Sequence, residues 1–344
     1  SDLDITYQLG ELGAQANAYT SIEQTVFYGA VLPENALAFT ELLGDMLMPA
    51  LAQEEYDMEK KVILEEIALY EDRPMHILFE GLMNEHFGSH KVANSILGTN
   101  QSITDLTSGQ MRAYHSQQYT TNSIFAVATG NINFRDFVKQ VETSTKDWRQ
   151  DKVSREVKAH NFVGSKKTIT RKNLQRGYCT ISLPFSSIQD EKSYPAAILS
   201  MILGDSTGSK TYWELIDKGI SDSAGFGIDE LDGVGMLYGY ASTNPEDIEK
   251  VSGILQGIVS DAGNFSDADL QRAKNKFASR SVFKAEIPMS RLMSVGTEWQ
   301  ALKNYESPAE QLAKIDAVTR EDILTLIANY LRVSPCIVNM LPEG

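Results

Sequence analysis

The hydrophobic and polar positions of the chain predict the same series of elements twice. Residues 25–32 and 234–243 alternate in polarity and are rich in aromatic side chains, which is typical of strands. A Pro-Glu pair follows each strand, at Pro33 and at Pro245, and proline is favoured in the first turn of a helix. The elements expected next are helices at 34–49, 54–71 and 107–117 with a strand at 123–130, and in the second half helices at 246–261, 267–285 and 319–331 with a strand at 335–341.

A shift of 212 residues brings several segments of the chain into register with one another. Pro33-Glu34 falls on Pro245-Glu246, and Tyr28 falls on Tyr240. Self-similarity at a fixed offset is typical of a duplicated structural unit. The expected fold class is therefore α+β, with two structurally similar halves, each a mainly antiparallel sheet with helices packed on one face. A polar, charged stretch at 143–158 predicts the seam between a first domain, 1–150, and a second, 151–344.

The same offset predicts a difference between the halves. Strands are expected at 161–171 and 176–185 and a helix at 191–203, and their counterparts would lie before Ser1. We therefore expect the first half to be truncated at its N-terminus by about 50 residues.

Charge and cysteine content narrow the class of protein. The chain has 344 residues, with 46 acidic and 31 basic side chains and a net charge of −15. This balance argues against nucleic acid or an anionic membrane surface as the partner, because both attract basic patches. Cys179 and Cys336 are too few for a disulfide scaffold. The first residues resemble no signal peptide, and the cellular compartment is left open, since any targeting segment would lie upstream of Ser1.

Candidate chemistry is concentrated on the helix at 54–71. Glu59 and Glu66 are two helical turns apart and share a face, and Val62-Ile63-Leu64 between them should bring part of the helix toward an apolar core. A carboxylate on a half-buried face requires a partner or a metal. The alternative is a solvated face that pairs with Lys60 and Lys61. The 212-residue offset places Gln271 and Ala278 at the equivalent positions, so the two carboxylates belong to one half only.

Three other segments give weaker signals. His86 and His90 have a spacing suited to a metal on a helix, but Gly88-Ser89 predicts a turn, and His76, His115 and His160 are interpreted as isolated. Residues 204–210 lack the order of a phosphate-binding loop and are interpreted as a connection between helices. Residues 13–23 predict a strand of small side chains, which is either an ordinary strand or an edge that accepts an extended peptide.

Three motifs together resemble one family. They are Asn17-Ala18-Tyr19-Thr20-Ser21-x-Glu23-x-Thr25, then Glu59-x-x-Val62-Ile63-Leu64-Glu65-Glu66-Ile67, and finally Ile96-Leu97-Gly98-Thr99 with Ser102-Ile103. The chain resembles the insulinase/pitrilysin family of zinc metallopeptidases, and among them the bacterial members similar to the mitochondrial processing peptidase. The resemblance implies two similar halves that close around an unfolded peptide, which a zinc-dependent endopeptidase cleaves.

The resemblance also implies roles for particular residues. Zinc would be held by an inverted His-x-x-Glu-His motif and by a distant glutamate, which is Glu66 here. Glu59 would be the acidic residue that supports the catalytic site. The strand Asn17, Ala18, Tyr19 and Thr20 would bind the substrate backbone.

The chain departs from the family pattern in two places. No His-x-x-Glu-His occurs in the sequence, so we expect this polypeptide to bind Zn²⁺ weakly and not to cleave peptides, because a catalytic zinc needs about three protein ligands. The Arg and Tyr that grip substrate in many relatives are absent from 216–222, which favours a homodimer or a heterodimer with a related peptidase-like subunit. The alternative function is a non-catalytic structural or peptide-binding subunit.

Overall fold

The computed structural model describes residues 2–153, 158–190 and 192–343. The chain forms two compact units, each made of three segments of sequence. Unit 1 comprises Ser1–Ile67, Ile96–Glu156 and Lys284–Thr297, and unit 2 comprises Ala68–Ser95, Val157–Phe283 and Glu298–Gly344. The division into domains 1–150 and 151–344 stays a prediction.

Unit 1 contains a β-hairpin backed by helices. Strand β1 (Gln15–Thr20) pairs antiparallel with β2 (Thr25–Ala30), with Gln15 opposite Ala30 and Thr20 opposite Thr25. Gly29 in β2 allows a close approach, because a Cβ there would lie 2.4 Å from the ring of the buried Phe39. The helices of this unit, in whole or in large part, are α1 (Asp2–Glu11), α2 (Ala36–Met46, after the 3₁₀ turn η1, Pro33–Asn35), α3 (Gln53–Glu71), α5 (Asn100–Asp105), α6 (Ser108–Gln118), α7 (Phe134–Thr145) and α11 (Pro288–Leu302).

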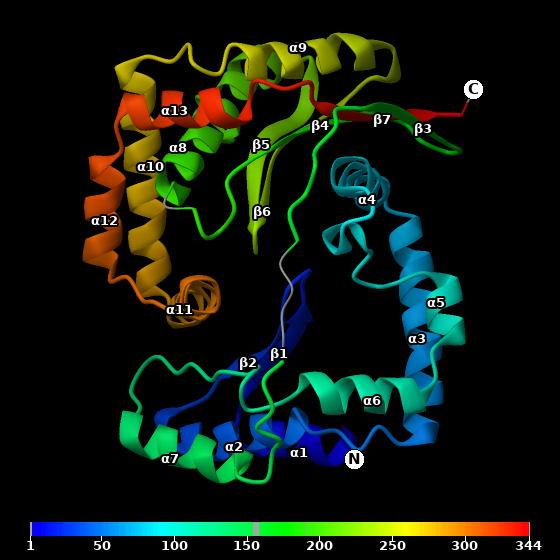
Figure 1. Ribbon diagram of the computed structural model, residues 1–344, viewed down its shortest axis with the longest axis vertical. Helices are drawn as coiled ribbons and strands as arrows, with labels where there is room; N and C mark the ends of the chain where they lie inside the picture. The colour runs from blue at the N-terminus through cyan, green and yellow to red at the C-terminus, as the bar shows by residue number, and fades with distance from the viewer. Residues whose placement is uncertain (1, 154–157, 191, 344) are drawn as a thin grey trace. The chain divides into compact units, whose positions relative to one another are not determined.

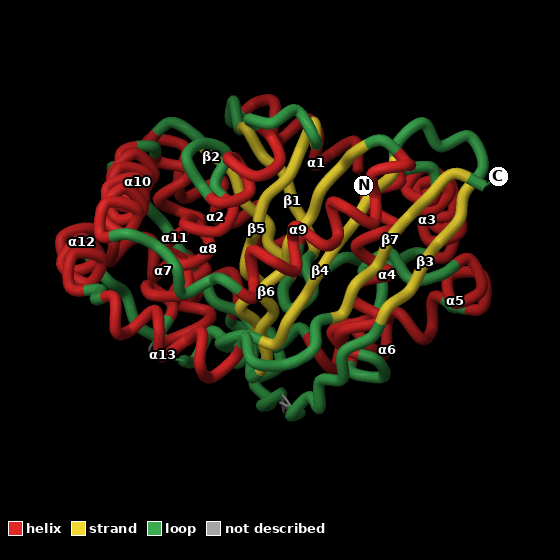
Figure 2. Tube along the Cα trace, turned by 90° about the horizontal axis from the view of Figure 1, so that it is seen from above, coloured by secondary structure: helices red, strands yellow, loops and turns green. Residues whose placement is uncertain are grey.

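Unit 2 is built on a sheet whose strand order is β3-β7-β4-β6-β5 within the described residues. The strands are β3 (Lys166–Arg171), β4 (Gly177–Pro184), β5 (Ser221–Leu231), β6 (Val234–Thr243) and β7 (Cys336–Pro342). Only the β3–β7 pair is parallel, and every other neighbouring pair is antiparallel. Figure 2 shows these strands side by side, with β3 at one edge and β5 at the other.

Helices cover both faces of this sheet. On one face, Ile181, Leu199 and Leu255 belong to a fully buried cluster that joins the sheet to α8 (Ser193–Gly204), α9 (Ile248–Ser260) and α13 (Arg320–Tyr330). On the other face, Leu78 and Leu82 of α4 (Pro74–Phe87) are also fully buried. In Figure 1, α9 and α4 lie on opposite sides of β4 and β7. The remaining elements of unit 2 are η2 (Lys91–Ala93), the π-helical turn η3 (Tyr212–Ile216), η4 (Pro245–Asp247), α10 (Asp267–Glu286) and α12 (Pro308–Ala317).

The predicted α+β fold of two sheet-and-helix halves is confirmed. One predicted element is wrong, because residues 123–130 form no strand, whereas β7 occupies the matching place in unit 2. The physical reason is that β7 lies between β3 and β4, and the described part of unit 1 contains no counterpart of either strand. A segment without neighbours has no partners for its backbone N–H and C=O groups. Within the described ranges, no helix combines the length and apolar character needed to cross a membrane.

Candidate functional site

Strand β1 presents an exposed edge made of small and polar side chains. Asn17, Ala18, Tyr19 and Thr20 are all exposed, and Tyr19 is 37% accessible. In the described residues β1 has a strand neighbour on one side only, which is β2. The strand at the matching position of unit 2, β5, is likewise an edge strand. The hairpin therefore leaves one backbone edge of β1 unpaired by any described strand.

The hydrogen bonds fix which backbone groups of β1 point to that edge. Ser21 N donates to Gln24 O at 2.8 Å, so this pair faces inward across the hairpin. Because inward and outward pairs alternate in an antiparallel ladder, the N–H and C=O groups of Ala16, Ala18 and Thr20 point outward. The Ala18 N–H donates instead to Asn17 Oδ1 at 2.8 Å, which agrees with this assignment. Ala18 thus offers a backbone donor that only a local side chain occupies.

Glu59 and Glu66 lie on α3, and both are exposed. The expectation that they share a half-buried face is wrong, and the alternative of a solvated face is the one observed. Ile67 is buried, at 5% accessible, whereas Val62 between the two glutamates is 51% accessible. Among the described residues, neither carboxylate makes a hydrogen bond or an ion pair, with β1 or with any other element.

Lys60 does not neutralise these carboxylates. Its ammonium donates to the backbone carbonyls of Thr104, at 2.5 Å, and Leu106, at 2.9 Å. Tyr56 Oη donates to the same Leu106 carbonyl at 2.6 Å. These bonds tie α3 to the connection between α5 and α6, so they fix the helix while its glutamate face stays accessible.

The structural counterpart of α3 is α10, at an offset of 214 rather than 212 residues. The two helices begin at Gln53 and Asp267, and the α3 bond from Lys60 to a carbonyl has a match in Lys274, which donates to Asp316 O at 2.6 Å. The offset changes because α9 is two residues longer than α2. The equivalents of Glu59 and Glu66 are therefore Ala273 and Arg280, and the predicted Gln271 and Ala278 are wrong.

That correspondence explains why the glutamate face of α3 is exposed. In unit 2, Ala273 is buried in the same core cluster as α8, and Arg280 pairs with Asp205 at the end of α8 at 2.5 Å. The described part of unit 1 contains no helix equivalent to α8. The face that is covered in one unit is consequently open in the other.

The residues present do not fit a zinc ion. Glu59 and Glu66 are seven residues apart on α3, which corresponds to a rise of about 10 Å along the helix axis. Among the described residues, no group of three or more His, Cys, Asp or Glu side chains is placed to hold a metal. Glu66 by itself supplies one of the roughly three ligands that a catalytic zinc requires.

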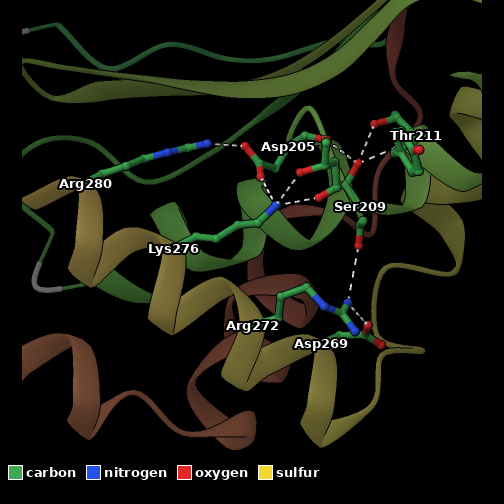
Figure 3. A network of polar contacts seen from close by, with 10 residues as sticks. Asp205, Ser209, Thr211, Asp269, Arg272, Lys276 and Arg280 are labelled. Atoms are coloured by element: carbon green, nitrogen blue, oxygen red, sulfur yellow. Dashed lines mark hydrogen bonds and ion pairs between the residues drawn. The ribbon is translucent and has the colours of Figure 1, made fainter.

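The loop at 204–210 is held by charges from α10 (Figure 3). Asp205, whose side chain is 7% accessible, pairs with Lys276 and with Arg280, each at 2.5 Å. Lys276 also donates to Thr207 O at 2.5 Å, and Arg272 pairs with Asp269 at 2.7 Å. Burial opposes ionisation of Asp205, but the two cations outweigh it and lower the pKa of the carboxyl. The three cations of α10 that face this loop, Arg272, Lys276 and Arg280, are thus all paired with protein oxygens.

Sequence reasoning missed one cluster of titratable side chains. His160, interpreted as isolated, lies with its ring centroid 5.7 Å from that of His86 and 6.2 Å from that of His90. The residues are about 70 positions apart, and nothing in their spacing indicates the contact. The pairing depends on α4 packing against the sheet of unit 2.

The fold places the chain in the class of two-unit α+β proteins, with an edge strand of small residues and a helix bearing two exposed carboxylates. Comparison with known families identifies it further. Residues 1–100 match the family described as insulinase (peptidase family M16), and residues 105–277 match the peptidase M16 inactive domain. The chain belongs to the insulinase family, peptidase family M16.

Relatives agree with this assignment, and solved structures share the fold. The uncharacterized zinc protease YmxG of Bacillus subtilis is 24% identical over 99% of this chain and 84% of its own length. An uncharacterized zinc protease of Streptomyces coelicolor is 25% identical over 97% of this chain and 75% of its own length. A protease from Helicobacter pylori has the same fold, with a TM-score of 0.90 at 15% identity over 98% of this chain and 84% of that one. A peptidase M16 inactive domain from Pseudomonas fluorescens gives a TM-score of 0.88 at 14% identity, over 99% and 83% of the two chains.

Proposed function

We propose that this chain is the peptide-binding part of a zinc-dependent metalloendopeptidase that acts on unfolded peptides, and that alone it binds such peptides without cleaving them. The observation that carries the proposal is the open edge of β1. An extended peptide adds to such an edge through main-chain hydrogen bonds, which require no particular substrate sequence. Asn17, Ala18, Tyr19 and Thr20 would form this binding strand.

The outward groups of Ala16, Ala18 and Thr20 recur at every second residue, which is the repeat of an added strand. The small side chains of Ala16 and Ala18 leave room for a second backbone at the strand distance of about 4.8 Å. The Asn17 side chain, which now accepts from the Ala18 N–H, would be displaced when the peptide carbonyl takes its place.

A proline substitution tests the edge. Ala18→Pro removes an outward N–H and leaves the inward pairing with β2 intact. We expect the dissociation constant of a fluorescein-labelled, unstructured 15-residue peptide to rise about tenfold, because one hydrogen bond is lost and the peptide register is disturbed. Fluorescence anisotropy measures this change.

Thr25→Pro is the matched control, because Thr25 is the outward residue opposite Thr20 and its N–H points to the far edge of β2. It should leave the dissociation constant within about twofold of the unsubstituted chain. Equal weakening by both variants, with both still folded by circular dichroism, would place peptide binding away from β1.

Zinc content separates the proposal from its alternatives. We expect zinc to be lost from the chain on dialysis, and the peptide to stay intact on prolonged incubation, since Glu66 is one ligand only. Elemental analysis and mass spectrometry of the peptide provide the two measurements. Zinc retained at one ion per chain, or a cleaved peptide, would contradict this expectation.

The alternative is a non-catalytic peptidase-like subunit that binds peptides. The exposed pair Glu59 and Glu66 favours the peptidase, because a solvent-facing glutamate at each position has no structural partner among the described residues. In the peptidase, Glu66 would serve as a metal ligand and Glu59 would support it, both together with histidines from outside this sequence. Residues 216–222 supply neither Arg nor Tyr, which favours a partner that is a second copy or a related subunit.

A further inference from the structure

Three histidines meet in unit 2, whereas β1 and most of α3 belong to unit 1. His86 lies in the last turn of α4, His90 lies in the turn after it, and His160 lies in the segment 158–165 that leads into β3. The rings of Phe87 and Phe162 lie 4.4 and 4.7 Å from the ring of His86. His86 is 1% accessible. His86 is therefore enclosed largely by aromatic rings, whereas His90 and His160 are half-buried.

The hydrogen bonds leave two imidazole nitrogens without partners. His86 Nδ1 shares a hydrogen bond with Ser182 Oγ at 2.9 Å. Nε2 of His86 and Nε2 of His160 are buried and have no partner among the described residues. Both nitrogens of His90 are engaged, one by the Val92 N–H at 3.3 Å and the other by the Lys158 carbonyl at 3.2 Å. Two free nitrogens are too few for a tetrahedral metal site.

The charged groups around the cluster do not stabilise an imidazolium. Glu85 of α4 pairs with Lys167 of β3 at 3.0 Å and accepts from Ser165 Oγ at 2.8 Å, so its carboxylate is already satisfied. Cys336 of β7 contributes a buried thiol, whose pKa is raised by burial and which is therefore neutral. Burial, together with the neighbouring His160, lowers the pKa of His86 to about 3. Burial also lowers the pKa of His160, although the backbone carbonyl of His86 opposes this effect.

The segment 158–165 is fastened to the sheet immediately beyond the histidines. A Cβ on Gly164 would lie 2.3 Å from Ser334 O, so the two backbones touch. Ile337 N donates to Ser165 O at 2.8 Å, and Cys336 Sγ donates to Val163 O at 3.4 Å and to Glu85 O at 3.5 Å. The segment thus covers the end of α4 and the start of β7, and the histidines lie where it begins.

We propose that His86 and His160 form an acid-sensitive latch, in which neutral imidazoles keep the segment 158–165 closed over the end of α4 and protonation opens it. The latch is independent of peptide binding at β1. A cation at His86 would be enclosed by aromatic rings, and one at His160 would lie half-buried beside it, with no free carboxylate next to either among the described residues. The open segment, by contrast, exposes both imidazoles to water.

The direction of the pH effect follows from the lowered pKa values. An exposed histidine has a pKa near 6.5, so the open state takes up protons first as the pH falls. The closed state is fully favoured above pH 6.5. Below that pH, each histidine lowers the ratio of closed to open molecules by about tenfold per pH unit, until the pH reaches the pKa of that histidine in the closed state. Lys167 and Ser165 lower the pKa of Glu85, which contributes stability above its ordinary value of 4.5 and loses it only at lower pH. Between pH 6.5 and 4.5 only the histidine effect operates, and below pH 4.5 the two effects overlap.

The two cysteines are buried on opposite faces of the sheet, so the labelling of each thiol reports whether its own face opens. Cys336 is covered by the latch, whereas Cys179 is buried in the cluster on the opposite face. The full chain is labelled with 4,4′-dithiodipyridine at pH 7.5 and pH 5.5, and each cysteine is quantified by peptide mass spectrometry against the urea-unfolded chain at the same pH. We expect relative labelling of Cys336 to rise about tenfold or more at pH 5.5, and that of Cys179 to stay constant.

Asparagine variants assign the effect to the histidines. His86→Asn and His160→Asn remove a titrating group while keeping a polar side chain, and each should reduce the rise in Cys336 labelling about tenfold. His76→Asn is the matched control, because His76 lies on the same helix and contacts Glu80 at the surface. It should retain the full rise. Should His86→Asn fail to fold by circular dichroism, His160→Asn carries the test.

Three outcomes would overturn the proposal. Labelling of both cysteines that rises in parallel would show global unfolding, and a full rise in both folded asparagine variants would show another titrating group. If Zn²⁺ added at pH 7.5 protects Cys336 from labelling in the unsubstituted chain but not in His86→Asn, the histidines form a metal site and not a latch.

Discussion

Among single side chains, Asp205 shows how charge stabilises unit 2. It is nearly buried, and it accepts from Lys276 and Arg280 of α10 while its backbone carbonyl accepts from Ser209 Oγ at 2.6 Å. Removing one partner of such a group costs more than the pair itself contributes, because the remaining charges are left without compensation. Lys276 and Arg280 are partly solvated, which reduces that cost.

Asp205→Asn therefore should lower the free energy of unfolding by about 2 kcal/mol at pH 7, as measured by urea denaturation. Because the cations lower its pKa, Asp205 contributes stability above its ordinary pKa of 3.8 and loses it as the pH falls below that value. The difference between the variant and the unsubstituted chain should consequently shrink near pH 3. Asp217→Asn is the control and should have little effect, because the exposed Asp217 side chain makes no hydrogen bond or ion pair among the described residues.

Single residues also show what sequence could and could not predict. The strand of Asn17 to Thr20 and the helix of Glu59 and Glu66 were predictable, because each depends on a local pattern. Exposure of the two glutamates was left open between a half-buried and a solvated face, since it depends on which element covers α3. The contact of His160 with His86 was equally inaccessible, because it joins segments that are distant in sequence and side chains that follow no periodic pattern.

Helices and strands with a clear hydrophobic period or a clear capping residue were predicted from the sequence, and those without such a signal were not. Helix α6 runs from Ser108 to Gln118, and α13 runs from Arg320 to Tyr330, each one close to its predicted range. Each begins with a threonine whose side chain accepts from the third residue of the helix, which marks the start in the sequence. Helix α4 lacked such a signal, because the side chain of Arg73 before it makes no capping hydrogen bond. Its buried side chains Leu78, Leu82 and His86 recur every four residues and so lie on one face, which packs on the sheet of unit 2.

Packing between elements explains features of sequence that carry no pattern at all. Gly204 ends α8, and a Cβ there would lie 1.8 Å from the backbone nitrogen of Phe226 in β5. The helix therefore approaches the strand more closely than any other residue would allow. Gly253 in the middle of α9 has open space beside it, so the two glycines, alike in sequence, have different structural meanings.

Over the whole molecule, neither compact unit is one continuous stretch of the sequence. Residues Ala68–Ser95 belong to unit 2 although both flanking segments belong to unit 1, and Lys284–Thr297 show the converse. The exchanged segments hold α4 and most of α11, which begin 214 residues apart, as α3 and α10 do. The internal repeat itself stays a prediction. The exchange of these segments between the units could not be derived from hydrophobic pattern, because pattern identifies helices and does not identify the sheet on which each one packs.

Net charge gives the last prediction, which belongs to the molecule as a whole. At −15, the chain should attract basic peptides and repel acidic ones over distances that salt screens. A peptide with four lysines should bind the open β1 edge at least about tenfold more tightly than the same peptide with four glutamates, at ~20 mM salt. Raising the salt to ~500 mM should bring the two dissociation constants to within about threefold, since the Debye length then falls to a few ångströms. Anisotropy titrations at both salt concentrations measure this, and Ala18→Pro should weaken both peptides alike because it acts on backbone hydrogen bonds. A preference for the lysine peptide that persists at high salt would instead indicate a specific acidic pocket.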